Sequence, residues 1–210
     1  SAGIDITMFM SDMSLNENLS STPQDRRELM DLVERMQGAF TTIAKSKIPT
    51  IALAHGFCIG GATSLVSACD IRLATKDAKF SIGETKLGLV ADVGVIQRMP
   101  KIVSSGDMNE LALTGRIFDG EHAEKIRFVS KVYENSDDLF EAGEKLANEI
   151  SSNSKRIVQA TKEALEKSSN LTVDQGLEYA KLWSTSFLVS EDLREGVMAF
   201  LEKRDPKFNE

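Results

Sequence analysis

The spacing of apolar residues predicts different structures in the two parts of the chain. Residues 26–43 predict an amphipathic helix, with Pro23 at a position that a helix start tolerates. Its apolar positions recur every three to four residues: Leu29, Leu32, Val33, Met36, Phe40 and Ile43. The short apolar run Ile51–Ala54 predicts a buried strand, and residues 129–133 predict another. Short helices are expected over residues 93–102 and 108–113. This part of the chain is therefore of mixed α/β type.

From residue 136 onward the pattern is wholly helical. Apolar residues recur at helical spacing in three successive segments, from Leu139 to Ile150, from Ile157 to Leu165 and from Leu177 to Leu188. Thr172 and Gln175 have the spacing of a capping box, and Ser190 is followed by acids suited to the first turn of a further helix. We expect an α/β core over residues 1–135, followed by a helical C-terminal region over residues 136–210.

A glycine pair, Gly60-Gly61, joins the predicted strand at Ile51–Ala54 to a predicted helix over residues 62–68. Two glycines let the backbone approach a ligand, and the free N–H groups at a helix start favour a negative charge. The pattern predicts a site for an anion or for a polarised carbonyl oxygen. The alternative is a tight helix entry that binds no ligand.

Composition narrows the classes of function. With 210 residues, 41% hydrophobic and 27% charged, the chain has the profile of a globular domain. Its formal charge of −7 argues against a general nucleic-acid or membrane-surface binder, and its longest apolar runs are too short to span a membrane. Two cysteines, Cys58 and Cys69, predict neither a disulfide framework nor a metal set, and the two histidines, His55 and His122, lie far apart in the sequence.

The start of the chain suggests that elements preceding it are missing from this sequence. Ser1 to Asp5 follows no strand and no methionine, and residues 8–22 are expected to form a loop. No targeting segment is visible, which favours a cytoplasmic location. A mitochondrial or peroxisomal location stays open, because a missing N-terminal segment could carry the signal.

Five ordered signatures resemble those of the crotonase superfamily, the enoyl-CoA hydratase/isomerase family. They are Ser1-Ala2-Gly3-Ile4-Asp5, then His55-Gly56 with Ile59-Gly60-Gly61, then Ala68-Cys69-Asp70-Ile71-Arg72, then Gly88 to Gly94 with Gln97-Arg98-Met99-Pro100, and Glu195-Gly196 to Phe208. The resemblance runs the whole chain. It implies a spiral core of repeated ββα units, whose first strands would precede this sequence, and C-terminal helices that build trimers, often paired into hexamers.

The resemblance also implies an acyl-CoA thioester as substrate, with no cofactor. The thioester oxygen would lie in an oxyanion hole made by the backbone N–H groups of Ile4 and Gly61. Preorganised donors of this kind each stabilise a developing oxyanion by about 3 kcal/mol. Residues of the same signatures are expected to bind the substrate: Ser1, Ala2, Gly3, Asp5, Gly60 and Ser64.

The carboxylates at two family positions decide the reaction. Hydratases of this family use two glutamates; the first position is Ser64 here, and the second is Glu84. Because a serine hydroxyl is not a general base near neutral pH, hydration by two carboxylates is disfavoured. Glu84 is the expected base.

Asp92 is the expected partner of Glu84. The stretch from Gly88 to Gly94 resembles the Δ3,5-Δ2,4-dienoyl-CoA isomerases, in which an aspartate and a glutamate at these positions transfer protons, although those enzymes carry an acid where this chain has Ser64. One carboxylate would remove a proton at one end of the conjugated system and the other would return one at the far end. The alternative role of Asp92 is the N-cap of the helix that follows it.

The resemblance thus favours an isomerase that moves double bonds in an unsaturated acyl-CoA. A Δ3-Δ2-enoyl-CoA isomerase that uses Glu84 alone, an enoyl-CoA hydratase, and a non-enzymatic scaffold or RNA-binding member are the alternatives. Near the C-terminus, Lys203, Arg204 and Lys207 have two interpretations: contacts with the phosphates of CoA, or part of a solvated helix end.

Overall fold

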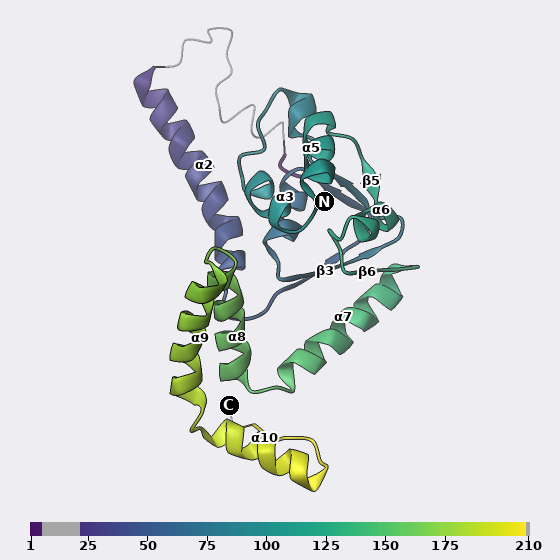
Figure 1. Cartoon of the computed structure of the whole chain (residues 1–210). Helices are drawn as coiled ribbons and strands as arrows, with labels where there is room; N and C mark the ends of the chain where they lie inside the picture. Colours follow the sequence, from purple (N-terminus) through teal and green to yellow (C-terminus); the bar gives the residue numbers. More distant parts are fainter. Residues whose placement is uncertain (6–21, 209–210) are drawn as a thin grey trace. The chain divides into compact units, whose positions relative to one another are not determined.

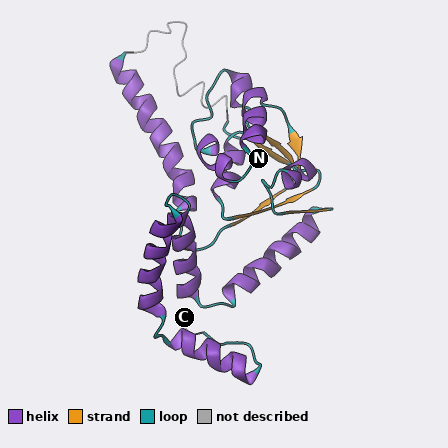
Figure 2. Cartoon of the chain, in the orientation of Figure 1, coloured by secondary structure: helices purple, strands orange, loops and turns teal. Residues whose placement is uncertain are grey.

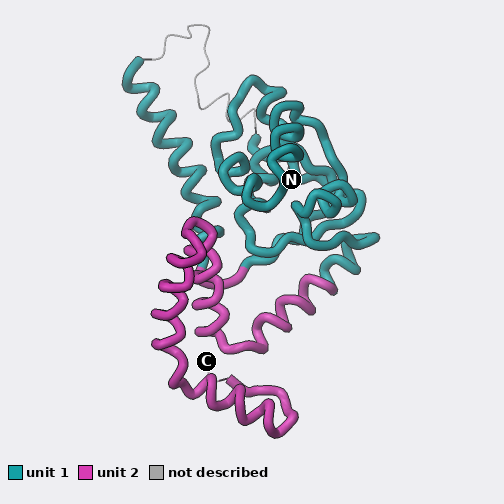
Figure 3. The backbone as a smooth tube through the Cα atoms, viewed as in Figure 1, with its two compact units in different colours: residues 1–46, 50–141 teal, residues 47–49, 142–210 magenta. Residues whose placement is uncertain are grey.

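The computed structural model describes residues 1–5 and 22–208, so that the predicted loop over residues 8–22 lies outside the described residues except for Thr22. The chain forms two compact units (Figure 3). The first comprises residues 1–46 and 50–141, and the second comprises residues 47–49 and 142–210. The division falls within helix α7, Ser136–Ser151, a little after the boundary expected at residue 135.

The first helix of the described chain is α2, Pro23–Ala44, which confirms the helix predicted over residues 26–43. It begins at a capping box in which Asp25 N–H donates to Thr22 Oγ1 at 3.2 Å and Thr22 N–H donates to Asp25 Oδ2 at 2.8 Å. Pro23 occupies the first turn, where its missing N–H costs no helical hydrogen bond. Figure 1 shows α2 as one long, continuous helix.

Two small sheets carry the strands of the first unit (Figure 2). One is parallel and has the order β1 (Ile51–Ala54), β3 (Ile71–Thr75) and β6 (Lys131–Tyr133). The other pairs β2 (Phe57–Ile59) in parallel with β4 (Lys79–Ser81), and β4 antiparallel with β5 (Phe118–Asp119). The strands expected at 51–54 and 129–133 are confirmed, as is the α/β class.

One connection differs from the expectation. The strand that leads into Gly60-Gly61 is β2, not the run Ile51–Ala54, because the chain turns at Gly56 with φ +61° and forms a second strand first. A three-residue strand is too short to leave a periodic pattern in the sequence.

Strand β3 also escaped prediction, because Arg72 interrupts its apolar run. In the structure Arg72 Nε donates to Phe128 O at 2.7 Å and Nη1 donates to Cys69 O at 2.6 Å. These contacts satisfy a partly buried guanidinium and tie β3 to the segment before β6.

Short helices and an aromatic cluster complete the first unit. The helices are α3 (Gly61–Ala68), η1 (Glu84–Leu87), α4 (Val95–Arg98), η2 (Met99–Lys101), α5 (Ser105–Thr114) and α6 (Gly120–Lys125). The helix expected over residues 93–102 is divided between α4 and η2, and the one expected over 108–113 lies within α5. In the core, the Phe80 ring lies 5.5 Å from the rings of both Phe118 and Phe128, and all three side chains are buried.

In the second unit the described regular elements are all helices: the rest of α7, then α8 (Lys155–Ser168), α9 (Val173–Phe187) and α10 (Glu191–Glu202). The capping box of Thr172 with Gln175 and the N-cap at Ser190 are confirmed. Ser154, the N-cap of α8, donates its hydroxyl to Asp192 Oδ2 at 2.6 Å and so connects α8 to α10. Among the described helices, none combines the length and the apolar character needed to cross a membrane.

Gly120 provides a test of the packing around β5 and α6. A Cβ on this buried residue would lie 2.0 Å from Thr75 O and 2.9 Å from Lys76 O, both of which are backbone atoms with little freedom to move. We expect Gly120→Ala to destabilise the protein by about 1–3 kcal/mol, measured by urea denaturation.

Gly106→Ala is the matched control. Gly106 also lies in the first turn of a helix, but its added Cβ would meet only Ser104 Oγ, at 3.8 Å. It should leave stability unchanged or raise it by about 0.5–1 kcal/mol. Equal effects of the two substitutions would contradict the assigned contact with strand β3.

Candidate active site

Hydrogen bonds to β2 and to β4 hold the turn from β2 into α3. Gly60 has φ +55°, a conformation suited to glycine, and its N–H donates to Ser81 O at 2.9 Å. The buried Thr63 hydroxyl shares its hydrogen between Cys58 O at 2.7 Å and Ser81 O at 2.9 Å. The start of α3 is thereby fixed to both β2 and β4.

The N-terminal segment lies along the same strand. The Ser1 nitrogen donates to Phe57 O, and Ile59 N–H donates to Ser1 O at 3.1 Å, as neighbouring strands do. Gly3 N–H donates to Ser1 Oγ at 3.2 Å. Ser1 and its neighbours therefore reach the glycine pair from the other side of β2.

Close packing brings the two expected oxyanion donors together. A Cβ on Gly3, which has φ +97°, would lie 2.7 Å from Ile59 O and 3.6 Å from Gly61 N. The Ile4 nitrogen lies 3.8 Å from the position that a Cβ would take on Gly61. Gly61 is the first residue of α3, so its N–H has no acceptor within the helix.

Glu84 lies beside this pair. Its Oε1 is 3.5 Å from the position of a Cβ on Gly60, and its Oε2 is buried without a hydrogen-bond partner among the described residues. Burial raises the pKa of Glu84, a hydrogen bond from its own backbone N–H acts in the opposite direction, and the negative charge of Asp92 raises the pKa further. Asp92 is thus close enough for the two carboxylates to interact.

Asp92 does not cap the following helix. Helix α4 begins at Val95, its N-cap is Gly94 with φ +119°, and no side chain caps it by a hydrogen bond. The alternative interpretation of Asp92 as a helix cap is therefore wrong. Its side chain is exposed, while both neighbours in the chain, Ala91 and Val93, are buried.

The other predicted site residues differ in their surroundings. Ser64 lies on α3 and is fully buried, and its Oγ has no hydrogen-bond partner among the described residues. Ala2 and Asp5 are exposed on the N-terminal segment.

The described part of the chain contains no group of three or more potential metal-ligating side chains. Burial raises the pKa of the Cys58 thiol to about 11, which makes it a poor nucleophile.

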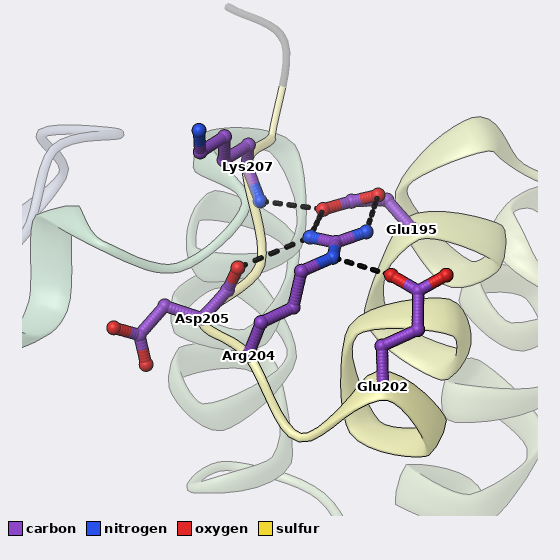
Figure 4. Close-up of polar contacts among 5 residues, drawn as sticks. All are labelled: Glu195, Glu202, Arg204, Asp205 and Lys207. Carbon is purple, nitrogen blue, oxygen red and sulfur yellow. Dashed lines mark hydrogen bonds and ion pairs between the residues drawn. The ribbon is translucent and has the colours of Figure 1, made fainter.

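Of the C-terminal cations, Arg204 has its side chain ion-paired within the second unit (Figure 4). Arg204 Nη1 and Nη2 donate to the two carboxylate oxygens of Glu195 at 2.6 and 3.0 Å, and Arg204 Nε donates to Glu202 Oε2 at 2.6 Å. Lys207 N–H donates to Glu195 Oε1 at 2.7 Å. Arg204 and the backbone of Lys207 lower the pKa of Glu195 to about 2. The guanidinium of Arg204 is therefore engaged in holding the chain end onto α10, which favours the interpretation as a helix end.

The arrangement in the first unit suits chemistry next to a carbonyl group. Two backbone N–H groups can donate hydrogen bonds to an oxygen on which negative charge develops. A carboxylate of raised pKa lies beside them and can transfer a proton. A second carboxylate interacts with the first.

The family model described as enoyl-CoA hydratase/isomerase matches residues 4–210. The chain belongs to this family. Among curated relatives, the mitochondrial Δ(3,5)-Δ(2,4)-dienoyl-CoA isomerase of Dictyostelium discoideum is 47% identical over 90% of this chain and 64% of its own length. The peroxisomal protein of the same name from Arabidopsis thaliana is 39% identical over 99% of this chain and 74% of its own length. The mouse mitochondrial protein of that name is 43% identical, and the chain spans 55% of it.

Solved structures of other proteins show the same fold. DspI from Pseudomonas aeruginosa superposes with a TM-score of 0.86 at 28% identity, covering 100% of this chain and 75% of the other. An enoyl-CoA hydratase from Shewanella pealeana has a TM-score of 0.83 at 25% identity. The match covers 99% of this chain and 74% of the other. The crotonase-type fold inferred from the five signatures is confirmed.

Thr63 is a structural residue of the candidate site that the sequence did not reveal. Its hydroxyl fixes the helix start that carries Gly61, through acceptors on two different strands. A hydroxyl residue inside the first turn of a helix commonly bonds locally, and nothing in the spacing indicated an acceptor at residue 81.

The titration of Glu84 tests the proximity of the two carboxylates. Its pKa in the folded protein should lie above the usual 4.5 and fall in Asp92→Asn, measured by carbon NMR of the labelled side-chain carboxyl. Because the Glu84 carboxyl binds its proton more tightly in the folded state than in the unfolded chain, protonated Glu84 adds to the stability of the fold below about pH 4.5. That contribution is lost as the pH rises through the raised pKa. An unchanged titration in Asp92→Asn would show that the two groups are too far apart to interact.

Proposed function

We propose that this protein is a Δ3,5-Δ2,4-dienoyl-CoA isomerase. The observation that carries the proposal is the Glu84 carboxylate, which lies beside the two oxyanion donors and within the electrostatic reach of Asp92. The names of relatives at 39–47% identity support it. A conjugated diene needs proton transfer at two separated carbons, and two carboxylates meet that requirement.

The proposed reaction begins with the thioester oxygen between the N–H groups of Ile4 and Gly61. Glu84 removes a proton from C2, and the electron pair moves into the conjugated system, placing negative charge on the thioester oxygen. Asp92 in its protonated form gives a proton to C6, and the double bonds shift from positions 3 and 5 to positions 2 and 4. Glu84 then loses its proton to solvent and Asp92 takes one up, which restores the starting state.

The surroundings of the two carboxylates support the assignment of Glu84 as the base and Asp92 as the proton donor. The raised pKa of Glu84 suits it to remove a proton and hold it. The exposure of Asp92 lets it exchange protons with solvent between turnovers.

The nearest alternative is a Δ3-Δ2-enoyl-CoA isomerase that uses Glu84 alone, and the exposure of Asp92 is the observation that favours it. Enoyl-CoA hydration is less well supported, because Ser64 supplies a hydroxyl where a hydratase needs a second carboxylate. A scaffold or RNA-binding role is disfavoured by the charge of −7.

The proposal extends to partners and location. The substrate supplies its own CoA group, and no further cofactor is needed. Exposed apolar side chains on α9 and α10, such as Leu177 and Phe200, support self-association as a trimer or a dimer of trimers. The named relatives are mitochondrial or peroxisomal, which favours one of these organelles over the cytoplasm expected from the sequence.

A spectrophotometric assay of the full-length protein with 3,5-dienoyl-CoA, 3-enoyl-CoA and 2-enoyl-CoA tests the proposal. The dienoyl substrate should turn over, and Glu84→Gln and Asp92→Asn should each lower kcat by about 10²–10⁴-fold, since each removes a proton-transfer group.

The other outcomes identify the alternatives. Turnover of the 3-enoyl substrate alone, unaffected by Asp92→Asn, would indicate a single-glutamate isomerase. Rapid hydration of the 2-enoyl substrate would show that Ser64 does not prevent that reaction. RNA binding that weakens steeply with salt, without turnover, would support the binding role.

Gly3→Ala tests the oxyanion hole. The added Cβ would collide with Ile59 O and displace the N–H of Ile4, so kcat should fall by about 10²–10³-fold, the usual cost of one oxyanion donor. Gly56→Ala is the control, because Gly56 also has a positive φ, +61°, but a Cβ there meets no atom within 4 Å. Equal losses in both variants would indicate general backbone strain rather than a lost donor.

A further inference from the structure

The turn that carries Asp92 is bonded to one face of α2. Gln37 Nε2 donates to Asp92 O at 2.7 Å, and Arg98 Nη2 donates to Thr41 Oγ1 at 3.0 Å. Gln37 and Thr41 are four residues apart on the helix, and so they lie on the same face, one turn from each other. Helix α2, distant in sequence, therefore contacts the turn directly at Asp92 and indirectly through Arg98 of α4.

Arg98 reaches its acceptors through space that only glycine leaves open. A Cβ on Gly94 would lie 1.8 Å from Arg98 Nη1, and Gly94 has φ +119°. The same nitrogen donates to Val93 O at 3.4 Å. The guanidinium thus lies against the turn and links Val93 to Thr41.

These hydrogen bonds supplement the packing of the turn. Residues 85–90, between the two carboxylates, are exposed. Ala91 and Val93 are buried on either side of Asp92, but the carbonyl of Asp92 itself is oriented by Gln37. The backbone at Asp92 is therefore held by its buried neighbours and by the contact with α2.

We propose that Gln37 and Thr41, together with Arg98, are positioning residues that set the placement of the Asp92 carboxylate relative to Glu84. They touch neither substrate nor reacting atoms and act through Asp92. The inference rests on the proposed function, in which Asp92 returns a proton to the far end of the diene.

Small displacements matter for such a step. A misplacement of about 1 Å in a catalytic group can cost about 10²-fold in rate. Gln37 is exposed, and an exposed hydrogen bond adds little to stability, so that its loss should disturb the turn without unfolding the protein.

The experiment compares Gln37→Met and Thr41→Val, which remove the donor and the acceptor on α2, in the full-length protein. Each should lower kcat for 3,5-dienoyl-CoA by about 10-fold, with KM unchanged. Any turnover of 3-enoyl-CoA, which needs Glu84 only, should be unchanged. In the Asp92→Asn background neither substitution should lower kcat further, because the group that they position is already lost.

Gln24→Met is the matched control. Gln24 lies in the first turn of the same helix, and its side-chain nitrogen donates to Glu28 Oε1 at 3.0 Å on the exposed surface. This variant should have wild-type kcat. Equal losses on both acyl-CoA substrates, or losses that add to that of Asp92→Asn, would overturn the positioning role in favour of a general structural one.

Carbon NMR of the Glu84 carboxyl separates this inference from the proposed function, because it needs no turnover. Asp92→Asn defines the full change in the Glu84 titration, and Gln37→Met should produce part of the same change. If the wild-type protein fails to convert the dienoyl substrate, the proposed function fails while this measurement still decides the positioning role. An unchanged Glu84 titration in Gln37→Met, beside a shifted one in Asp92→Asn, would overturn the inference.

Discussion

The carbonyl oxygen of Ser81 accepts two hydrogen bonds, from Gly60 N–H and from the Thr63 hydroxyl, and the candidate site depends on this junction. It joins the end of strand β4 to the start of helix α3. Because Glu84 follows Ser81 by three residues, fixing Ser81 to the glycine turn also brings the Glu84 carboxylate to Gly60. The Gly61 donor and the Glu84 carboxylate are therefore positioned by one set of contacts, while Ile4 is held by the pairing of the N-terminal segment with β2.

The site combines neutral donors with negatively charged side chains. In the proposed reaction the N–H groups of Ile4 and Gly61 are dipoles already in place, so that little reorganisation is needed when negative charge develops on the thioester oxygen. The partial burial of Glu84 and the charge of Asp92 both raise the pKa of Glu84, which makes it a stronger base than an ordinary surface carboxylate.

The second unit contains a network of ion pairs near the C-terminus. Glu195, Glu202 and Arg204 form a group of charge-assisted hydrogen bonds that holds the chain end against α10. The bidentate geometry of Arg204 on Glu195 suits a structural role, since the planar guanidinium is fully matched to a carboxylate. Within the C-terminal signature, Glu195 and Arg204 therefore have a structural role.

Local features were set by the sequence alone. The helical period of α2, the capping box at Thr172 and the N-cap at Ser190 depend on residues within a few positions of one another, and all were predicted. The ordered signatures identified the family and drew attention to Glu84 and Asp92. Only the tertiary structure decided which groups meet across long stretches of chain. Three such contacts join residues that are 18 to 56 positions apart: Arg72 with Phe128, Thr63 with Ser81, and Gln37 with Asp92. Such distances leave no periodic trace in the sequence, because they arise from how strands and helices pack and not from the preference of any local segment.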